Sequence, residues 1–190
     1  MFKLNAKFIR NVQELCLIAS AATLTACASI PLSSALELRG TQLEDIDTNQ
    51  MEIVVASDQF FNPESAVALI SGYSGKKRAK LTLTEVPLTN GVTEGLPNVS
   101  SGQTLKRFRL DAASNAELKR LQTNVALKES KREVSFAAYT PGCYTTKPVE
   151  PKFVLSIYLK ISDEKGFIPL FKNIEYDVPK KVPETYFCDN

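Results

Sequence analysis

The 190-residue chain contains no histidine and no tryptophan. Histidine is the usual general base of serine and cysteine hydrolases and the commonest zinc ligand, so its absence excludes the most frequent forms of both kinds of site. The sequence also lacks a nucleophile elbow, a phosphate-binding P-loop and the glycine fingerprint of dinucleotide-binding domains. We therefore expect a protein that is not an enzyme and that uses no metal or cofactor.

Neither charge sign is in excess over most of the chain. The first 26 positions hold three of the 23 basic and one of the 21 acidic residues, which leaves 20 of each in the remainder. Nucleic-acid binding needs a basic excess that displaces counterions, so we expect no nucleic-acid partner. Long apolar runs are also absent after position 26, and no second segment is predicted to cross a bilayer.

The N-terminal segment has the layout of a secretory signal. Three basic residues within the first ten positions precede an apolar run, residues 15–26, that is too short to span a bilayer. The run ends in Leu-Thr-Ala and is followed directly by Cys27. This ending resembles the lipobox of bacterial lipoproteins. The resemblance covers about the first 27 residues and implies that the Cys27 sulfur receives a diacylglycerol, that cleavage precedes Cys27, and that the new amino group is acylated.

By this resemblance Cys27 is the first residue of the mature protein and its membrane anchor. Two or three acyl chains hold a protein durably, because each buried methylene contributes about 0.8 kcal/mol. In lipoproteins an aspartate at the second mature position favours retention in the inner membrane, and this chain has Ala28 there. The resemblance therefore implies a protein at the outer membrane that faces the periplasm. The alternative is an ordinary signal peptide followed by a buried or free Cys27.

The remainder of the chain divides into a short tether and one domain. Residues 1–26 are interpreted as the signal peptide, residues 27–35 as the lipidated N-terminus and tether, and residues 36–190 as a single domain. An extended tether of this length spans at most about 30 Å. We therefore expect the domain to lie close to the membrane leaflet.

Cysteine usage agrees with export. Cys16 lies in the signal and Cys27 is assigned to lipid, which leaves Cys143 and Cys188. Two thiols in an oxidising compartment most simply form a disulfide. Closing a loop of about 45 residues contributes about 4 kcal/mol as an upper estimate. A redox or metal-binding pair is the alternative, which the long spacing and the absence of histidine disfavour.

Alternation of apolar and polar residues predicts seven β-strands. The clearest has Phe153, Ile157 and Ile161 on a wholly apolar face, and we expect that face to build the core. Ile157→Asp is then expected to be costly, and Tyr158→Asp, on the opposite face, much less so. Residues 104–110 are predicted to form an edge strand with Phe108 and Leu110 facing inward. The predicted strands comprise residues 51–57, 66–73, 79–86, 104–110, 134–139, 152–162 and 167–178.

One helix is predicted within this series of strands. Residues 114–117 match a capping box, and Leu118, Leu121 and Val125 form a narrow apolar stripe that indicates a surface helix. Residues 163–166 have the composition of a hairpin turn. The absence of βαβ alternation predicts a mainly β protein: an antiparallel β-sandwich of about seven strands with one inserted surface helix.

Basic residues form the main candidate binding surface. The hairpin between two predicted strands carries Lys76, Lys77, Arg78 and Lys80. Together with the cations of residues 104–110 (Lys106, Arg107 and Arg109), this group is a candidate contact for anionic lipid or an acidic partner. The favoured interpretation is a solvated hairpin and an edge strand protected by charge. The long loop over residues 89–103 is a second candidate recognition surface.

Two smaller groups offer weaker candidates. The acidic residues Glu44, Asp45, Asp47 and Asp58 include carboxylates for glycoside hydrolysis or a calcium site, but they lack an ordered ligand spacing and are interpreted as loop charges. The pair Phe60-Phe61 precedes turn residues. It is interpreted as a plug at the end of the sandwich, with an exposed binding anchor as the alternative.

These observations predict a membrane-anchored accessory lipoprotein that faces the periplasm and binds another cell-envelope component without catalysis. The alternative is a carrier of a lipid or small apolar ligand within the β domain. The two hypotheses differ in the interior of the domain. A lined cavity of several hundred Å³ favours the carrier, and a filled core favours the binding protein.

Overall fold

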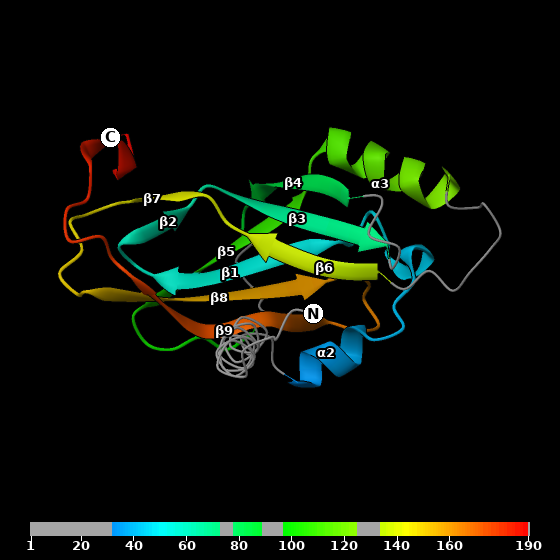
Figure 1. Ribbon diagram of the computed structural model, residues 1–190, viewed down its shortest axis with the longest axis horizontal. Coiled ribbons are helices and arrows are strands. Elements are labelled where there is room, and N and C mark those ends of the chain that lie inside the picture. The colour runs from blue at the N-terminus through cyan, green and yellow to red at the C-terminus, as the bar shows by residue number, and fades with distance from the viewer. Residues whose placement is uncertain (1–31, 73–77, 89–96, 125–133, 190) are drawn as a thin grey trace, which may run out of the picture.

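The computed structural model describes residues 32–72, 78–88, 97–124 and 134–189 (Figure 1). The fold is mainly β with antiparallel strands and one longer helix inserted among them, which confirms the predicted fold class. The helices are α2 (Leu32–Leu38) and α3 (Ala112–Asn124). The strands are β1 (Glu52–Asp58), β2 (Phe61–Pro63), β3 (Ser65–Gly72), β4 (Arg78–Val86), β5 (Gln103–Leu110), β6 (Val134–Tyr139), β7 (Gly142–Tyr144), β8 (Lys152–Lys160) and β9 (Phe167–Asp177).

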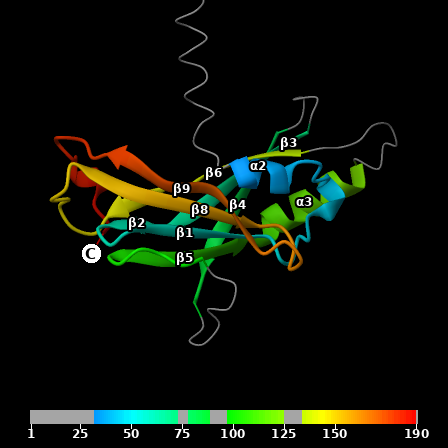
Figure 2. The ribbon, with the colours of Figure 1, turned by 90° about the horizontal axis from the view of Figure 1, so that it is seen from below.

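Seven strands are hydrogen bonded into one continuous sheet in the order β6-β3-β4-β5-β1-β8-β9, and β2 pairs with β7 in a separate ribbon. Figure 2 shows β9, β8, β1 and β5 side by side, in agreement with this order. The sheet curves so far that its two edge strands, β6 and β9, line the same cleft. The layers expected of a sandwich are thus opposite parts of a single, nearly barrel-like sheet.

The core lies on the concave face of the sheet. The predicted apolar face of β8 is buried there, from Phe153 through Ile157 to the following Ile161. Leu118 of α3 is fully buried in the same core. Each fully buried side chain of this size contributes about 1.5–3 kcal/mol. Leu159 of β8 is also buried in this core. Neighbouring strands add further large buried side chains, which include Ile53, Leu81, Leu83 and Phe108.

The opposite face of β8 is buried as well. Tyr158 retains only 6% of its exposure and forms a second apolar cluster with Val54 and Ala56 of β1. The expectation that Tyr158→Asp costs much less than Ile157→Asp therefore no longer holds, because both substitutions bury a carboxylate. Sequence alternation located the two faces of the strand, but it did not show that both are covered.

Strand β5 lies inside the sheet, between β4 and β1, so the prediction of an edge strand at residues 104–110 is wrong. Its predicted inward face is correct: Phe108 is fully buried and Leu110 packs against the core. The charged side chains that indicated an edge instead form ion pairs with neighbouring strands.

Helix α3 begins at Ala112, earlier than the predicted capping box. The Asp111 carboxylate accepts a hydrogen bond from the Ser114 backbone N–H at 2.6 Å, so Asp111 is the capping residue. The Ser114 hydroxyl accepts one from the Thr82 N–H at 2.8 Å and joins the helix to β4. Leu118 and Leu121 face the core as predicted. Val125 lies outside the described residues.

Helix α2 contacts β9 and begins at Leu32 (Figure 1). The last residues of the predicted tether are therefore helical rather than extended. Leu36 of this helix is exposed. Over the described ranges, no helix has the length and apolar character needed to span a membrane.

Candidate functional site

The β2–β7 ribbon is tied to the C-terminal segment by the Cys143–Cys188 disulfide, as predicted. The Cys188 N–H also donates a hydrogen bond to the Tyr144 carbonyl oxygen at 3.0 Å. A cross-link between positions this far apart in the chain stabilises the fold mainly by restricting the unfolded state. The ribbon and the chain end are thereby held together at one end of the sheet.

Gly142 allows the ribbon to close tightly over an aromatic ring. A Cβ atom at this position would lie 2.6 Å from the Phe61 ring carbon Cζ and 2.6 Å from the Asn62 carbonyl oxygen. Both distances are far shorter than real carbon contacts, so glycine fits here and a larger residue would displace the ring. The close approach fixes the position of Phe61.

Phe61 begins a stack of three rings that crosses from the ribbon to the sheet. Its ring centroid lies 5.1 Å from that of Phe153, and the Phe153 centroid lies 5.4 Å from that of Tyr176. Such pairs contribute about 0.5–1.5 kcal/mol beyond the area that they bury. Phe60 contacts Phe153 edge-on and is half-buried. The Phe60-Phe61 pair therefore plugs the end of the domain, as interpreted from the sequence.

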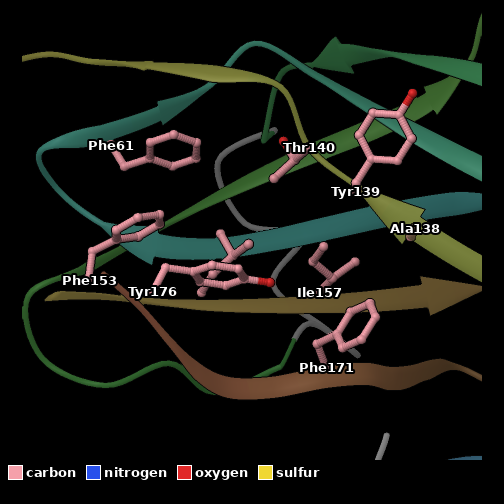
Figure 3. Close-up of a pocket in the computed structure, with 9 residues that line it drawn as sticks. Phe61, Ala138, Tyr139, Thr140, Phe153, Ile157, Phe171 and Tyr176 are labelled. Carbon is pink, nitrogen blue, oxygen red and sulfur yellow. The ribbon is translucent and has the colours of Figure 1, made fainter. Parts of the chain in front are cut away.

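The three stacked rings also form one wall of a cleft of about 280 Å³ between the edge strands (Figure 3). In Figure 3 the Phe61, Phe153 and Tyr176 rings lie at one end of the cleft, with Ile157 and Phe171 along its side. The edge strand β6 closes the opposite side. The lining consists of Phe61, Ala138, Tyr139, Thr140, Phe153, Leu155, Ile157, Phe171 and Tyr176.

The chemistry of this cleft is that of an apolar binding site. Its lining contains no carboxylate, ammonium or guanidinium group. The Thr140 hydroxyl is already engaged, because it donates to the Ser65 carbonyl oxygen at 2.7 Å. Tyr139 and Tyr176 remain 43% and 40% exposed at the rim. The cleft therefore offers apolar contact with two phenol hydroxyls beside it, and no group placed for proton transfer.

A buried ion cluster lies on the outer face of the sheet. The Glu52 carboxylate is fully buried and accepts two hydrogen bonds from Arg107 at 2.6 Å and one from Arg109 at 2.7 Å. Burial raises the pKa of Glu52, but the hydrogen bonds and charges of both arginines outweigh burial and hold the pKa below its usual value. The Glu52 hydrogen bond raises the pKa of Arg107. The cluster joins β1 to β5.

Ion pairs explain the cations of β5, which the sequence offered as part of a candidate binding surface. Arg107 and Arg109 pair with Glu52, and Lys106 pairs with Glu85 at 2.7 Å. Arg78 is the first residue of β4, and the exposed Lys80 follows on the same strand. Lys76 and Lys77 lie outside the described residues. The β5 cations are therefore engaged in ion pairs, and contact of the basic hairpin with an anionic surface stays a prediction.

The acidic residues predicted as weak candidates bind backbone groups or border turns. Asp45 accepts the Gln42 N–H at 2.7 Å, Asp47 accepts the Asn49 N–H at 2.8 Å, and Asp58 accepts the Val154 N–H at 2.8 Å. Glu44 lies with Asp45 in a short 3-10 helix, Leu43–Asp45. Within the described part of the chain, no group of three or more ligand-type side chains could hold a metal ion. The acidic residues are thus not brought together as a site.

Two further candidates lie wholly or partly outside the described residues. Cys27 is outside them, and so are residues 89–96 of the predicted recognition loop. Of the remainder of that loop, Val99 packs against the Val54 and Tyr158 cluster on the outer face of the sheet. This part of the loop therefore covers the sheet.

Sequence reasoning missed the cleft, although it identified some of its residues. Phe153 and Ile157 were assigned to the core, and Phe61 to the end plug. Tyr139 and Tyr176 were not singled out, because their role depends on β6 and β9 approaching one another across a curved sheet. A large aromatic residue at the end of each edge strand was the available signal.

Comparison with known proteins returned no match: no family model fits the chain, and no curated protein or solved structure is significantly similar to it.

Proposed function

We propose that this chain is a lipid-anchored accessory protein of the bacterial cell envelope whose β domain binds another envelope component in the aromatic cleft. The observation that carries the proposal is the uncharged cleft between the two sheet edges, with Tyr139 and Tyr176 exposed at its rim. Exposed tyrosines beside an apolar pocket are typical of protein interfaces, because they combine a large apolar ring with a hydroxyl that hydrogen bonds.

The lipobox-like sequence supports an anchor close to this domain. Leu32 begins α2 only five residues after Cys27. Five residues span at most about 18 Å, so a lipid on Cys27 would hold α2 near the headgroups of its leaflet. The exposed Leu36 on this helix and the contact of α2 with β9 support an anchor on the β9 side of the sheet.

The interior of the domain favours a binding protein over a carrier. The concave face is filled by packed side chains, including Phe108, Leu118 and Ile157. The described cleft lies at the sheet edges, and its volume is slightly below the roughly 300 Å³ at which small-molecule sites begin. It suits one or two side chains of a partner better than a whole lipid. A small apolar ligand remains the second candidate, because the lining is aromatic and uncharged.

Site-specific photo-crosslinking in intact cells tests the proposal. A photoreactive residue in place of Tyr176 is expected to give one discrete protein adduct, because this position lies at the rim of the cleft. The same residue at Tyr139 is expected to capture the same protein from the opposite rim. The matched control is Glu164, which is exposed in the β8–β9 turn and does not line the cleft.

Three results would contradict the proposal. Equal crosslinking from Glu164 would indicate nonspecific contact, and the absence of adducts from both rim positions would place the partner elsewhere. Adducts with a lipid or other small molecule alone, identified by mass spectrometry, would favour the carrier.

The anchor is tested separately by Cys27→Ser. We expect this variant to leave the membrane fraction or to accumulate as an unprocessed precursor, because the acyl chains contribute the durable attachment. Normal processing with full membrane retention would contradict lipidation at Cys27.

A further inference from the structure

The edge strand β6 carries none of the features that usually block a sheet edge. Its sequence, Val-Ser-Phe-Ala-Ala-Tyr, contains no charge, no proline and no glycine. Val134, Phe136 and Ala138 pack toward the core, and the alternate residues are exposed. Such a strand presents a regular row of backbone groups on which another strand can pair.

Two hydrogen bonds establish which backbone groups of β6 face outward. The Val134 N–H donates to the Thr41 carbonyl oxygen at 3.0 Å, on the side away from β3. The Pro141 carbonyl oxygen accepts the Glu64 N–H at 3.1 Å, on the β3 side. Pro141 is an odd number of residues from Val134, so its backbone groups face the opposite way. Because backbone direction alternates along a strand, the N–H and C=O groups of Phe136 and Ala138 point outward with those of Val134. No described residue hydrogen bonds to the outward groups of Phe136 and Ala138.

The outward edge of β6 borders the aromatic cleft. Ala138, Tyr139 and Thr140 form the β6 side of the lining, and Phe171 and Tyr176 form the β9 side. An extended chain that paired with Phe136 and Ala138 would therefore run along the cleft and direct alternate side chains into it. Thr41 already occupies the first pairing position, beside Val134, and fixes where such a chain would begin.

We infer that the partner supplies an extended, uncharged segment that adds as a strand to the free edge of β6 and places apolar side chains in the cleft. This inference rests on the proposed function and specifies its partner. Strand addition combines backbone hydrogen bonds, which give affinity, with side-chain pockets, which give specificity. The uncharged lining selects apolar side chains, because an ion placed there would lose its hydration without gaining a countercharge.

A second copy of this chain fits the site less well than a segment of a different protein. In a β6–β6 pair, Val134, Phe136 and Ala138 of the second copy would remain in that copy's own core. Its exposed face offers Tyr139 as the single large side chain, beside Ser135 and Ala137. The cleft would then gain little apolar contact, and the occupant is therefore assigned to another protein.

A pair of synthetic peptides tests strand addition. The first is a blocked seven-residue peptide in which valine and leucine alternate with threonine. The second has the same side chains but carries N-methyl groups on alternate backbone amides, so that one hydrogen-bonding edge is lost. Binding to the full chain in detergent is measured by NMR titration and by amide exchange.

The first peptide is expected to bind and to slow exchange of the Phe136 and Ala138 amides. The methylated peptide is expected to bind at least about tenfold more weakly, because several backbone hydrogen bonds are lost. Equal affinity of the two peptides, or binding of neither, would overturn strand addition. So would slow exchange of both amides before peptide is added. Loss of that protection on dilution would indicate a second copy, and its persistence would indicate another segment of this chain.

A second test of strand addition alters the protein and not the peptide, with the substitution Ala138→Pro. This substitution removes an outward-facing N–H, and proline is tolerated on an edge strand when its nitrogen faces away from the sheet. We expect peptide affinity to fall about tenfold while the melting temperature drops by less than about 5 °C. Unchanged affinity in the folded variant would contradict the inference.

The peptide measurements and the crosslinking from Tyr176 separate this inference from the proposed function. If Tyr176 forms protein adducts in cells but the two peptides bind equally well, the envelope-binding function stands and strand addition is contradicted. If the two peptides bind with different affinities but no protein adduct forms in cells, the proposed function is contradicted. The identification of the strand donor as an envelope protein is then contradicted as well.

Discussion

Strand β9 interrupts its edge of the sheet with Pro169, the charged residues Lys172 and Glu175, and Asn173 at a positive φ of 53°, whereas β6 at the other edge has none of these features. The pairing of β9 with β8 also shifts register twice, and α2 contacts β9. Bulges, proline, charge and covering helices are the usual means by which proteins prevent edge-to-edge association. Among the described residues, one edge of this sheet is therefore protected, and the other is open beside an apolar cleft from Phe136 onward.

The two edges also differ in what holds them in place. On the β9 side, Tyr176 belongs to the ring stack that reaches Phe61 through Phe153. On the β6 side, the strand is held by its ladder to β3 and by the inward side chains of Val134 and Phe136. The β9 wall of the cleft is thus tied to the β2–β7 ribbon by stacked rings, whereas the described contacts of β6 leave the outward backbone groups of Phe136 and Ala138 available for pairing.

The largest effect on the free energy of unfolding is expected from Phe153→Ala, which removes the middle ring of the stack on the β9 side of the cleft. We expect a loss of about 3–5 kcal/mol in the free energy of unfolding, because Phe153 is buried and contacts rings on both sides. Urea denaturation gives the value. Tyr176→Ala serves as the comparison and is expected to cost less, since its ring is 40% exposed. Equal losses of stability in the two variants would mean that Phe153 is no more important to the stack than Tyr176.

The disulfide at the same end of the domain gives the next largest effect. Replacing both Cys143 and Cys188 with serine is expected to lower the free energy of unfolding by up to about 4 kcal/mol, because the unfolded chain gains freedom. Calorimetry of the variant and of the reduced parent measures the loss. Quantitative alkylation of both cysteines in the native parent without reductant would contradict the pairing.

Between the two edges, the centre of the sheet contains the buried Glu52 carboxylate, which makes the fold sensitive to acid. Its pKa is lowered in the folded state, so its contribution is fully present above the usual value of 4.5 and is lost as pH falls through the lowered pKa. Glu52→Gln is expected to destabilise the protein by about 3 kcal/mol at neutral pH and to flatten this acid dependence. Denaturation across pH values measures both effects. Glu184→Gln, at an exposed position, is the control, and an unchanged profile for Glu52→Gln would contradict the assignment.

The protected character of β9 depends on Asn173. Its backbone N–H donates to the Ser156 hydroxyl at 2.8 Å, and its positive φ disfavours β-branched residues. Asn173→Val is expected to lower the free energy of unfolding by about 2 kcal/mol. Asn173→Gly, which permits the same φ, is expected to cost less than about 1 kcal/mol. A valine variant as stable as the glycine variant would show that the irregularity in β9 is not needed.

The smallest effect on stability is expected from Ala137→Lys, on the exposed face of β6. The free energy of unfolding is predicted to change by less than about 0.5 kcal/mol, because the side chain lies in solvent. The added charge protects the open edge, so binding of the valine- and leucine-containing peptide is expected to weaken. Unfolding and peptide titration are measured on the same variant. Unaltered peptide binding would indicate that the peptide does not pair with β6.

Sequence reasoning recovered the local features of this fold because they repeat at short range. Residues 134–139 and the apolar face of β8 follow directly from alternation, and the Cys143–Cys188 pair from the count of remaining thiols. The three-residue strands β2 and β7 were missed, because Pro63 and Gly142 appear as turn residues when their pairing partners are unknown.

Features that depend on strand order could not be predicted in the same way. Charges on residues 104–110 indicated an edge, yet they serve ion pairs inside the sheet, such as that of Arg107 with Glu52. The burial of Tyr158 and the meeting of β6 with β9 at the cleft likewise depend on contacts between distant segments. Periodicity defines which residues share a face, but not which strand lies beside it.

Native-state amide hydrogen exchange along β6 tests the open edge most directly. The N–H groups of Ser135, Ala137 and Tyr139 face β3 and are predicted to exchange slowly, whereas those of Phe136 and Ala138 face outward and are predicted to exchange rapidly. NMR on the full chain resolves these five amides individually. Alternating protection would support an open edge beside the cleft, and uniformly slow exchange at all five would contradict it.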